Sequence, residues 1–202
     1  MLYFTSDLHL GHLRALEIMP NRPWASVDEM NEGLISNYNS VVDQDDTVVF
    51  LGDVIMGKKF DNVPKFLPRL NGNKFLVCGN HDFLPHELSV EKLNNLINLY
   101  KSHGIIEIYY GTITLGEMFG NSDDYAKLKL CHFPPSYISD HINEYEKRYA
   151  ELHPVLEDGD YLLHGHTHSK NRITAPNVIH VGVDAWDYKP VSFEAIKELL
   201  TL

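Results

Sequence analysis

The chain has 202 residues, of which 44% are hydrophobic and 22% are charged, an ordinary composition for one globular domain with a buried core. Its formal net charge of −11 argues against tight, sequence-independent binding of duplex nucleic acid, because an acidic surface repels a polyanion. No apolar run approaches the ~20 residues that span a bilayer, and the N-terminus lacks a signal-peptide pattern. We therefore expect one domain over residues 1–202, cytoplasmic and without a membrane partner.

Seven buried strands are predicted from short apolar runs bounded by turn residues. They cover residues 1–6, 47–53, 74–80, 104–111, 126–132, 160–166 and 177–184. Helical spacing of apolar residues predicts a helix behind Ser26, one within 86–102 and one behind Ser192. Strands that alternate with helices indicate an α/β protein. Because no helix is predicted between the strands of 104–132, a mixed sheet is favoured.

The chain has few cysteines and many histidines. Cys78 and Cys131 are too few for a disulfide framework, which suits a reducing compartment, and each ends an apolar run, so both are expected to be buried core residues. Twelve histidines, in contrast, are many for a chain of this length. Three of them, His164, His166 and His168, alternate at the end of one predicted strand, where alternate side chains share a face.

Polar side chains follow five of the predicted strands at the point where each strand ends. In chain order these side chains are Asp7 and His9, then Asp53, then Asn80, His81 and Asp82, then His132, then His166 and His168. Sites in α/β proteins are built at the carboxyl ends of strands, and neighbouring glycines let the backbone turn sharply there. A single strand-end Asp or His is typical of a cap or turn. Five predicted strands that all end in such residues predict a common site.

The predicted site has the chemistry of a metal centre. Asp and Asn oxygens together with His nitrogens suit Mn²⁺, Fe, Zn²⁺ or Co²⁺, whereas the absence of paired cysteines argues against a structural zinc. Seven candidate ligands exceed what one ion needs, so two ions about 3.5–4 Å apart that share one carboxylate are expected. The seven ligands are Asp7, His9, Asp53, Asn80, His132, His166 and His168.

These motifs, in this order, resemble the signature of the calcineurin-like metallophosphoesterase superfamily. The blocks D-x-H, G-D, G-N-H-D, H and G-H-x-H are all present between residues 7 and 168. The opening "DLHLGH", the "RPW" that follows and "GVDAWDYKPVSF" near the end are similar to a branch of small bacterial and phage phosphoesterases. The resemblance implies an α/β (α+β) fold of four layers: a mixed β-sandwich of two sheets flanked by helices.

The resemblance also implies a role for each matching residue. The first metal would be held by Asp7, His9 and His168, the second by Asn80, His132 and His166, and Asp53 would bridge both. Mn²⁺ is expected, with Fe, Zn, Ni, Co or Mg as alternatives. A metal-bridging hydroxide would attack phosphorus. His81 would act as general acid for the leaving oxygen, oriented by Asp82, whose charge would raise the pKa of His81.

The expected activity is metal-dependent hydrolysis of small phosphodiesters, nucleotides and cyclic nucleotides among them. A phosphomonoesterase or a nuclease of the same superfamily is an alternative, although the acidic balance counts against a nuclease. A non-catalytic binding module is a further alternative, as in retromer's phosphoesterase-like subunit, which has lost the catalytic histidine. Because His81 is present with every ligand, the enzyme is favoured.

Two further residues are candidate substrate contacts. His12 either contacts the substrate phosphate or simply begins a helix, and Arg22 either clamps the phosphate or is a solvated loop residue. His164 is expected to have a structural role or to support a ligand from behind. The loops at 21–26, 56–62 and 116–126 contain no recognisable specificity motif, so the sequence leaves the substrate open.

Overall fold

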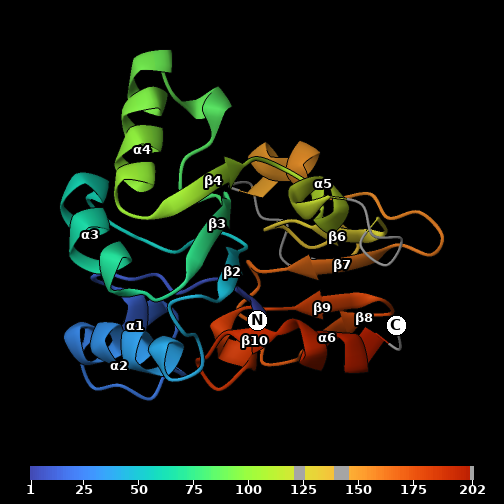
Figure 1. Cartoon of the computed structure of the whole chain (residues 1–202), viewed down its shortest axis with the longest axis horizontal. Coiled ribbons are helices and arrows are strands. Elements are labelled where there is room, and N and C mark those ends of the chain that lie inside the picture. Colours follow the sequence, from blue (N-terminus) through green and yellow to red (C-terminus); the bar gives the residue numbers. More distant parts are fainter. Residues whose placement is uncertain (121–125, 139–145, 201–202) are drawn as a thin grey trace.

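Two five-stranded sheets pack face to face in the computed structural model, which describes residues 1–120, 126–138 and 146–200 (Figure 1). The first sheet has the order β10 (Val191–Ser192), β1 (Leu2–Thr5), β2 (Thr47–Phe50), β3 (Asn73–Val77) and β4 (Ile105–Tyr109). The second has the order β5 (Ile113–Thr114), β6 (Leu128–Leu130), β7 (Tyr161–His164), β9 (Val178–His180) and β8 (Ile173–Ala175). Each sheet combines parallel and antiparallel pairs, which confirms the predicted mixed sandwich.

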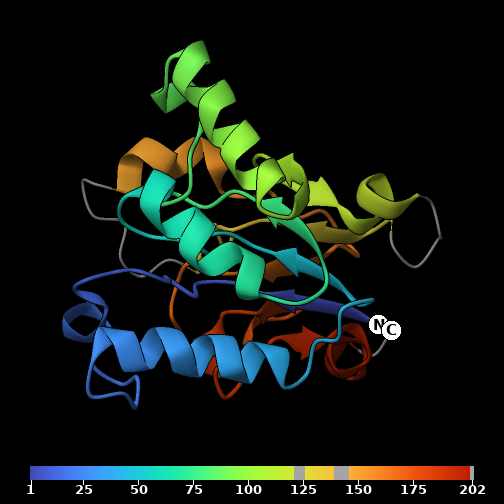
Figure 2. The same ribbon diagram turned by 60° about the vertical axis from the view of Figure 1, so that its left-hand side comes forward.

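Helices flank the sheets. They are α1 (Ala15–Ile18), α2 (Val27–Asn39), α3 (Lys59–Phe66), α4 (Val90–Ser102), α5 (Leu115–Phe119) and α6 (Phe193–Leu200). Helices α2, α3 and α4 lie on one side of the first sheet (Figure 2). Short 3₁₀ turns occupy Leu67–Arg69, Pro85–Glu87, Glu146–Leu152 and Val183–Ala185. No helix in the described ranges is long and apolar enough to cross a membrane.

Caps and periodicity explain the elements that the sequence predicts. The Ser26 hydroxyl accepts a hydrogen bond from the Glu29 amide at 3.2 Å, and the Ser192 hydroxyl accepts one from the Ala195 amide at 3.3 Å, as expected for N-caps. The expectation that no helix separates the strands of 104–132 is wrong, because α5 lies there. This helix is only five residues long and is fixed by the Thr114–Glu117 capping box rather than by a periodic apolar face.

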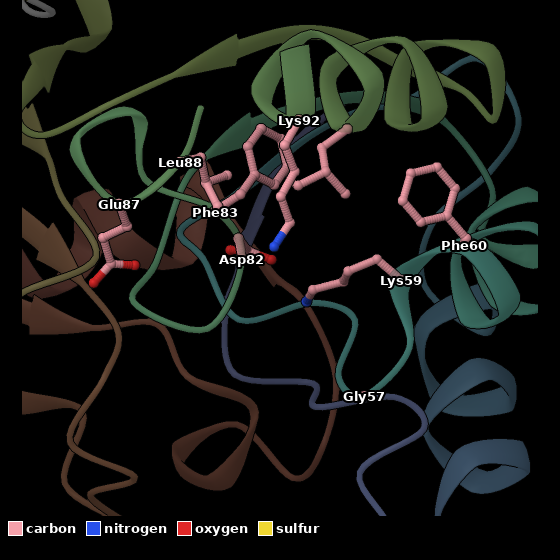
Figure 3. Close-up of a pocket in the computed structure, with 9 residues that line it drawn as sticks. Gly57, Lys59, Phe60, Asp82, Phe83, Glu87, Leu88 and Lys92 are labelled. Atoms are coloured by element: carbon pink, nitrogen blue, oxygen red, sulfur yellow. The ribbon is translucent and has the colours of Figure 1, made fainter. Parts of the chain in front are cut away.

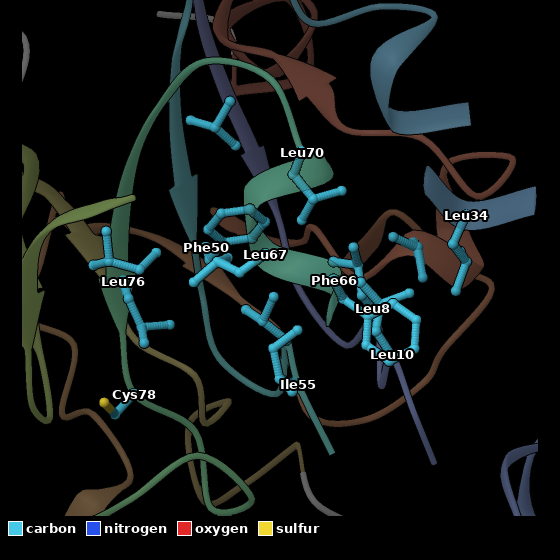
Figure 4. Close-up of a cluster of buried hydrophobic side chains, with 14 of the residues drawn as sticks. Leu8, Leu10, Leu34, Phe50, Ile55, Phe66, Leu67, Leu70, Leu76 and Cys78 are labelled. Carbon is cyan, nitrogen blue, oxygen red and sulfur yellow. The ribbon is translucent and has the colours of Figure 1, made fainter. Parts of the chain in front are cut away.

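Alternation along the central strands produces two core layers. In β2, Val48 and Phe50 belong to the core shared with the helices, whereas Val49 belongs to the core between the two sheets. Figure 4 shows Phe50 packed beside residues of α3 and the turn after it. Each fully buried side chain of this size contributes about 1.5–3 kcal/mol, so both faces of the sheet hold the strands in register. Cys78 and Cys131 are both buried and free, as predicted.

Candidate metal centre and active site

The loops that follow the strands are joined to one another by backbone hydrogen bonds. The Asp7 amide donates to the Gly52 carbonyl at 3.1 Å, and the His9 amide donates to the Asp53 carbonyl at 2.9 Å. Within the second sheet, the Gly165 amide donates to the His132 carbonyl at 3.0 Å. Between the two sheets, the His166 amide donates to Asp7 Oδ2 at 2.9 Å. The carboxyl ends of β1, β2, β6 and β7 therefore meet at one place, and the predicted ligands from both sheets meet with them.

Backbone strain is concentrated at these predicted ligands. Five of the eight non-glycine residues with positive φ in the described part of the chain are Asp7 (59°), His9 (53°), Asp53 (56°), His166 (71°) and His168 (49°). A left-handed conformation costs a non-glycine residue of order 1–3 kcal/mol and persists only where the surrounding structure imposes it. Strain of this kind clusters at functional sites, where side chains must converge on one point.

Two motif glycines are required by close packing against the ligands. A Cβ atom at Gly79 would lie 2.3 Å from Asp53 Oδ1, and one at Gly52 would lie 2.4 Å from His132 Nδ1. Gly52 also has a φ of 87°, which other residues rarely adopt. The glycines of the G-D and G-N-H-D motifs thus leave space for the ligands of neighbouring strands.

In the first predicted group, the ligand atoms lie too far apart to hydrogen-bond to one another. Asp7 Oδ1 lies 3.8 Å from His9 Nε2 and 3.9 Å from His168 Nε2. Asp7 Oδ1 and both ring nitrogens of His9 are buried and have no hydrogen-bond partner within the described ranges. Buried polar atoms without a partner are costly and rare in folded proteins. A cation between Asp7 Oδ1 and His9 Nε2 would satisfy both of these atoms.

The second predicted group is more tightly gathered. Asn80 Oδ1 lies 2.9 Å from His132 Nε2 and 3.2 Å from His166 Nδ1, and the two imidazole nitrogens are 3.2 Å apart. Ligand atoms about 2.1 Å from one metal and at right angles to each other are separated by about 3 Å. The spacing of this group therefore suits a single ion. His132 Nδ1 faces the Leu51 carbonyl at 2.8 Å, which leaves Nε2 for the cluster.

Asp53 lies between the two groups. Its Oδ2 atom is 3.7 Å from His9 Nε2 and 3.6 Å from His132 Nε2, one imidazole of each group. Its Oδ1 atom accepts a hydrogen bond from the His81 amide at 2.9 Å, which fixes the orientation of the carboxylate. This nearly equal separation is the arrangement expected of a carboxylate that two ions share.

The protonation of these groups also fits bound cations. Burial lowers the pKa of His9 and of His166 to about 3, so at neutral pH both imidazoles are uncharged and have a lone pair to offer a metal. Burial raises the pKa of Asp53 to about 7, and the nearby carboxylates Asp82 and Asp7 add to this rise. A divalent cation beside Asp53 would remove this penalty. The donor set thus fits a pair of divalent metal ions.

Asp184 supports the first group from behind, and sequence reasoning missed it. Its Oδ2 lies 3.0 Å from His168 Nδ1, which turns His168 Nε2 toward Asp7. Burial alone would raise the pKa of Asp184, but hydrogen bonds from His168 and Arg22 lower it to about 2. Like the other site residues, Asp184 follows a predicted strand, and this position was the signal that could have identified it.

Arg22 does not face the phosphate position, so the expectation of a phosphate clamp is wrong. The residue is only 4% exposed, which also contradicts the alternative of a solvated loop. Its guanidinium donates to both Asp184 oxygens at 3.0 and 2.8 Å, to the Asp7 carbonyl at 2.6 Å and to the Leu8 carbonyl at 3.1 Å. Arg22 instead ties Asp184 to the loop that contains the first ligands.

His81 lies at the exposed edge of the cluster, with its ring centre 5.6 Å from that of His9. Desolvation by its surroundings, reinforced by His132, lowers the pKa of His81 to about 4. Asp82 does raise this pKa, as predicted, but the net shift is downward. Asp82 Oδ2 accepts hydrogen bonds from the Asp53 amide at 2.7 Å and the Gly79 amide at 2.9 Å. No hydrogen bond joins Asp82 to the His81 ring within the described chain, so Asp82 holds the ligand loops and the prediction that it orients His81 is wrong.

The two remaining candidates have distinct positions. The His12 ring centre is 5.8 Å from that of His9, but its Nδ1 accepts a hydrogen bond from the Arg14 amide at 3.1 Å, as at the start of a helix. His164 is fully buried. Its Nδ1 faces the Gly165 carbonyl and its Nε2 faces the Thr174 hydroxyl, each at 2.8 Å. His164 is therefore structural, while His166 and His168 belong to different ligand groups.

Comparison with known proteins agrees with this geometry. A family model for calcineurin-like phosphoesterases matches residues 2–170. The Gene 66 protein of Mycobacterium phage L5 is 34% identical over 208 residues, covering 98% of this chain and 93% of that protein. The protein MJ1445 of Methanocaldococcus jannaschii is 29% identical over 206 residues, covering 98% and 90%. The crystal structure of AQ665 from Aquifex aeolicus, a protein of unknown function, has a TM-score of 0.65 and 26% identity and covers 98% of both chains. The chain therefore belongs to the calcineurin-like phosphoesterase family.

Proposed function

We propose that the protein is a two-metal phosphodiesterase that hydrolyses small diesters. The position of Asp53 Oδ2, 3.7 Å from His9 Nε2 and 3.6 Å from His132 Nε2, is the observation that carries this proposal. It joins two groups of nitrogen and oxygen donors through one carboxylate. The proposed ligands are Asp7, His9 and His168 for one ion, Asn80, His132 and His166 for the other, and Asp53 for both.

Two pockets beside the ligands support a diester over a monoester. One has a volume of about 290 Å³ and is lined by Asp82, which holds the ligand loops, and the other has a volume of about 280 Å³ and is lined by the ligand His168. A phosphodiester has two substituents on phosphorus and needs room for both, whereas a monoester needs room for one. Pockets of similar size at two places along the cluster suit the two arms of a diester.

The chain's own residues divide the work of the reaction. When bound, the two divalent cations, Mn²⁺ in our proposal, activate a water molecule and neutralise charge on the phosphoryl oxygens. Asp184 and Arg22 hold His168 in place, and Asp82 holds the backbone around Asp53. His81 is neutral before substrate binds; the negative phosphate raises its pKa, so that His81 takes up a proton from solvent and then donates it to the leaving oxygen.

Paired chromogenic substrates test this proposal. The purified protein is supplied with Mn²⁺, and hydrolysis of bis(p-nitrophenyl) phosphate and of p-nitrophenyl phosphate is followed with and without chelator. A Mn²⁺-dependent preference for the diester is expected. A preference for the monoester would replace the proposal with a phosphomonoesterase. No turnover of either compound by a protein that binds two metals would favour a binding module on this fold.

The role of His81 needs a substrate with a poor leaving group. p-Nitrophenolate leaves readily without a proton, so His81→Ala should affect bis(p-nitrophenyl) phosphate less than an alkyl diester. We expect a loss of roughly 10²–10⁴-fold with the alkyl diester, at unchanged metal content. An equal loss with both compounds would indicate that His81 binds the phosphate instead of protonating the leaving oxygen.

A further inference from the structure

The pocket beside Asp82 has walls of two kinds (Figure 3). It lies between the start of α3, the loop after β3 and the first half of α4. Phe83 and Leu96 are buried and form its apolar floor, and Leu88 lies beside them. Phe60, at the rim, is 57% exposed. A large aromatic side chain left open next to an apolar floor marks a surface that a ligand can cover.

Both positively and negatively charged side chains line this pocket. The ammonium groups of Lys59 and Lys92 point toward Asp82 in Figure 3. Lys59 donates a hydrogen bond to the Ile55 carbonyl, which holds its ammonium group in place. Lys92 makes no ion pair with any described residue, and Asp82 Oδ1 is buried without a hydrogen-bond partner in the same described ranges. The two ammonium groups are thus the polar groups that the pocket offers to a ligand.

The balance of charge selects the class of ligand. Lys59 and Lys92 are offset by Asp82 and by Glu87, which also lines the pocket, so a purely anionic group gains little there. A sugar would set its hydroxyl groups against the apolar floor and leave them unpaired. A flat aromatic ring with acceptors on its edge matches both kinds of wall, because its face covers Phe60 or Phe83 and its edge accepts from the lysines.

We propose that this pocket binds the nucleobase of a nucleotide substrate, with Lys59 and Lys92 on the edge of the base and Phe60 and Phe83 on its face. The inference rests on the proposed function, which places the phosphate at the metal ligands. Asp82 links the two places, because its Oδ2 holds the Asp53 and Gly79 amides while the residue also lines the pocket. Stacking of a base on an aromatic side chain contributes about 1–3 kcal/mol.

Equilibrium binding measures the contribution of the base without requiring turnover. The Mn²⁺-loaded protein is titrated by calorimetry with AMP, GMP, CMP and UMP, and separately with ribose 5-phosphate, which has the same phosphate and sugar but no base. At least one nucleotide should bind tenfold or more tightly than ribose 5-phosphate. Equal affinity for ribose 5-phosphate and all four nucleotides would overturn the inference.

Two pocket variants and a matched control assign any preference to this site. Leu88→Trp fills the pocket, and Lys92→Ala removes one donor, so in both the ratio of nucleotide to ribose 5-phosphate affinity should fall toward one. Lys101→Ala serves as the control, because Lys101 lies on the same helix and pairs with Glu107 at the surface. The control should keep the wild-type ratio. A ratio that neither pocket variant changes would place base recognition elsewhere and overturn the inference.

The outcome is separable from that of the proposed function. If the protein hydrolyses no diester but still prefers nucleotides over ribose 5-phosphate in a Lys92-dependent way, the proposed activity fails and the pocket stands. If it hydrolyses bis(p-nitrophenyl) phosphate but binds ribose 5-phosphate as tightly as every nucleotide, the activity stands and the pocket assignment fails. Protein stability, measured by urea unfolding, must be retained in Leu88→Trp; otherwise Lys92→Ala alone decides.

Discussion

The two halves of the proposed metal centre are held in different ways. In the first half, Asp7 Oδ1 is 3.8–3.9 Å from its imidazole neighbours, and neither this oxygen nor the His9 ring has a hydrogen bond among the described residues. In the second half, Asn80 Oδ1, His132 Nε2 and His166 Nδ1 lie only 2.9–3.2 Å from one another. Residues outside the cluster hold the ligands of the first half apart, whereas the ligands of the second half contact one another.

The scaffold of the first half is the buried network of Arg22 and Asp184. It fixes His168 and the Asp7 backbone from outside the ligand cluster, so a metal enters without displacing any hydrogen bond of this network. A metal in the second half must replace the close contacts that its own ligand atoms make with one another. Preorganised sites bind more tightly because reorganisation is avoided. We therefore expect two classes of metal affinity, with the first half the tighter.

Asp53→Asn should have the largest effect, because Asp53 is the one residue that both halves share. The neutral amide keeps the shape but removes the bridging charge, so bound metal should fall from two ions to one or none. Diester turnover should fall at least about 10³-fold, which corresponds to about 4 kcal/mol. Metal content by atomic emission and turnover of bis(p-nitrophenyl) phosphate test this. Two bound ions in the variant would show that Asp53 does not bridge.

Asn80→Ala should separate the two halves. It removes the one oxygen ligand that belongs to the second group alone and leaves the first group intact, so only the weaker class of metal should be lost. Activity should fall roughly 10²-fold and recover in part at high Mn²⁺ concentration. Calorimetric titration with Mn²⁺ distinguishes the classes. If Asn80→Ala instead loses the more tightly bound metal, the second half would be the tighter site.

Asp184→Asn should weaken the scaffold without touching a ligand. The loss of the carboxylate leaves His168 without its anionic partner, and metal affinity of the first half should fall roughly 10–100-fold. The variant should also be less stable, because Arg22 loses the charge that it pairs with in the interior. Unchanged affinity of the tighter metal class would show that Asp184 supports only the fold.

The stability effect of Asp184 has a defined pH window. The pKa of Asp184 is lowered to about 2 in the folded protein, against about 3.9 in the unfolded chain, so its contribution is present above pH ~4 and is lost as pH falls toward 2. The difference in unfolding free energy between wild type and Asp184→Asn should be about 2–3 kcal/mol at pH 7 and should narrow at pH 3. Urea unfolding in chelator measures both values.

Sequence reasoning found the ligand cluster because its residues come at the ends of predicted strands. Asp7, Asp53 and Asn80 each follow a parallel strand, and the apolar run before each of them identifies the strand end without structural information. It did not find the scaffold, because nothing in the sequence indicates that Arg22 and Asp184, which are 162 residues apart, pair with each other. It also misjudged Asp82, since adjacency in sequence to His81 suggested a contact that the backbone geometry prevents. Long-range pairing and local side-chain direction were the missing information.

His180→Leu should give the smallest effect, and it tests whether the interior behind the first half tolerates charge. His180 is fully buried, and both ring nitrogens are without a hydrogen-bond partner in the part of the chain that the structure describes. Burial lowers its pKa to about 4, against about 6.5 in the unfolded chain, so the imidazole costs stability as pH falls from 6.5 toward 4. In the metal-free protein, a leucine at this position removes that cost. The variant should match wild type within about 1 kcal/mol at pH 7.5 and gain on it by about 1 kcal/mol per pH unit below 6.5.

Urea unfolding of both proteins in chelator, repeated across this pH range, measures the gain. His86→Leu, at an exposed position, controls for the loss of an imidazole. Because the His86 ring is open to water, its replacement should leave the pH dependence of stability as it is in wild type. The free energy of unfolding could change equally with pH in wild type and in His180→Leu. That result would mean that His180 takes up a proton in the folded protein as easily as in the unfolded chain. The first half would then lie against an interior more polar than its contacts indicate.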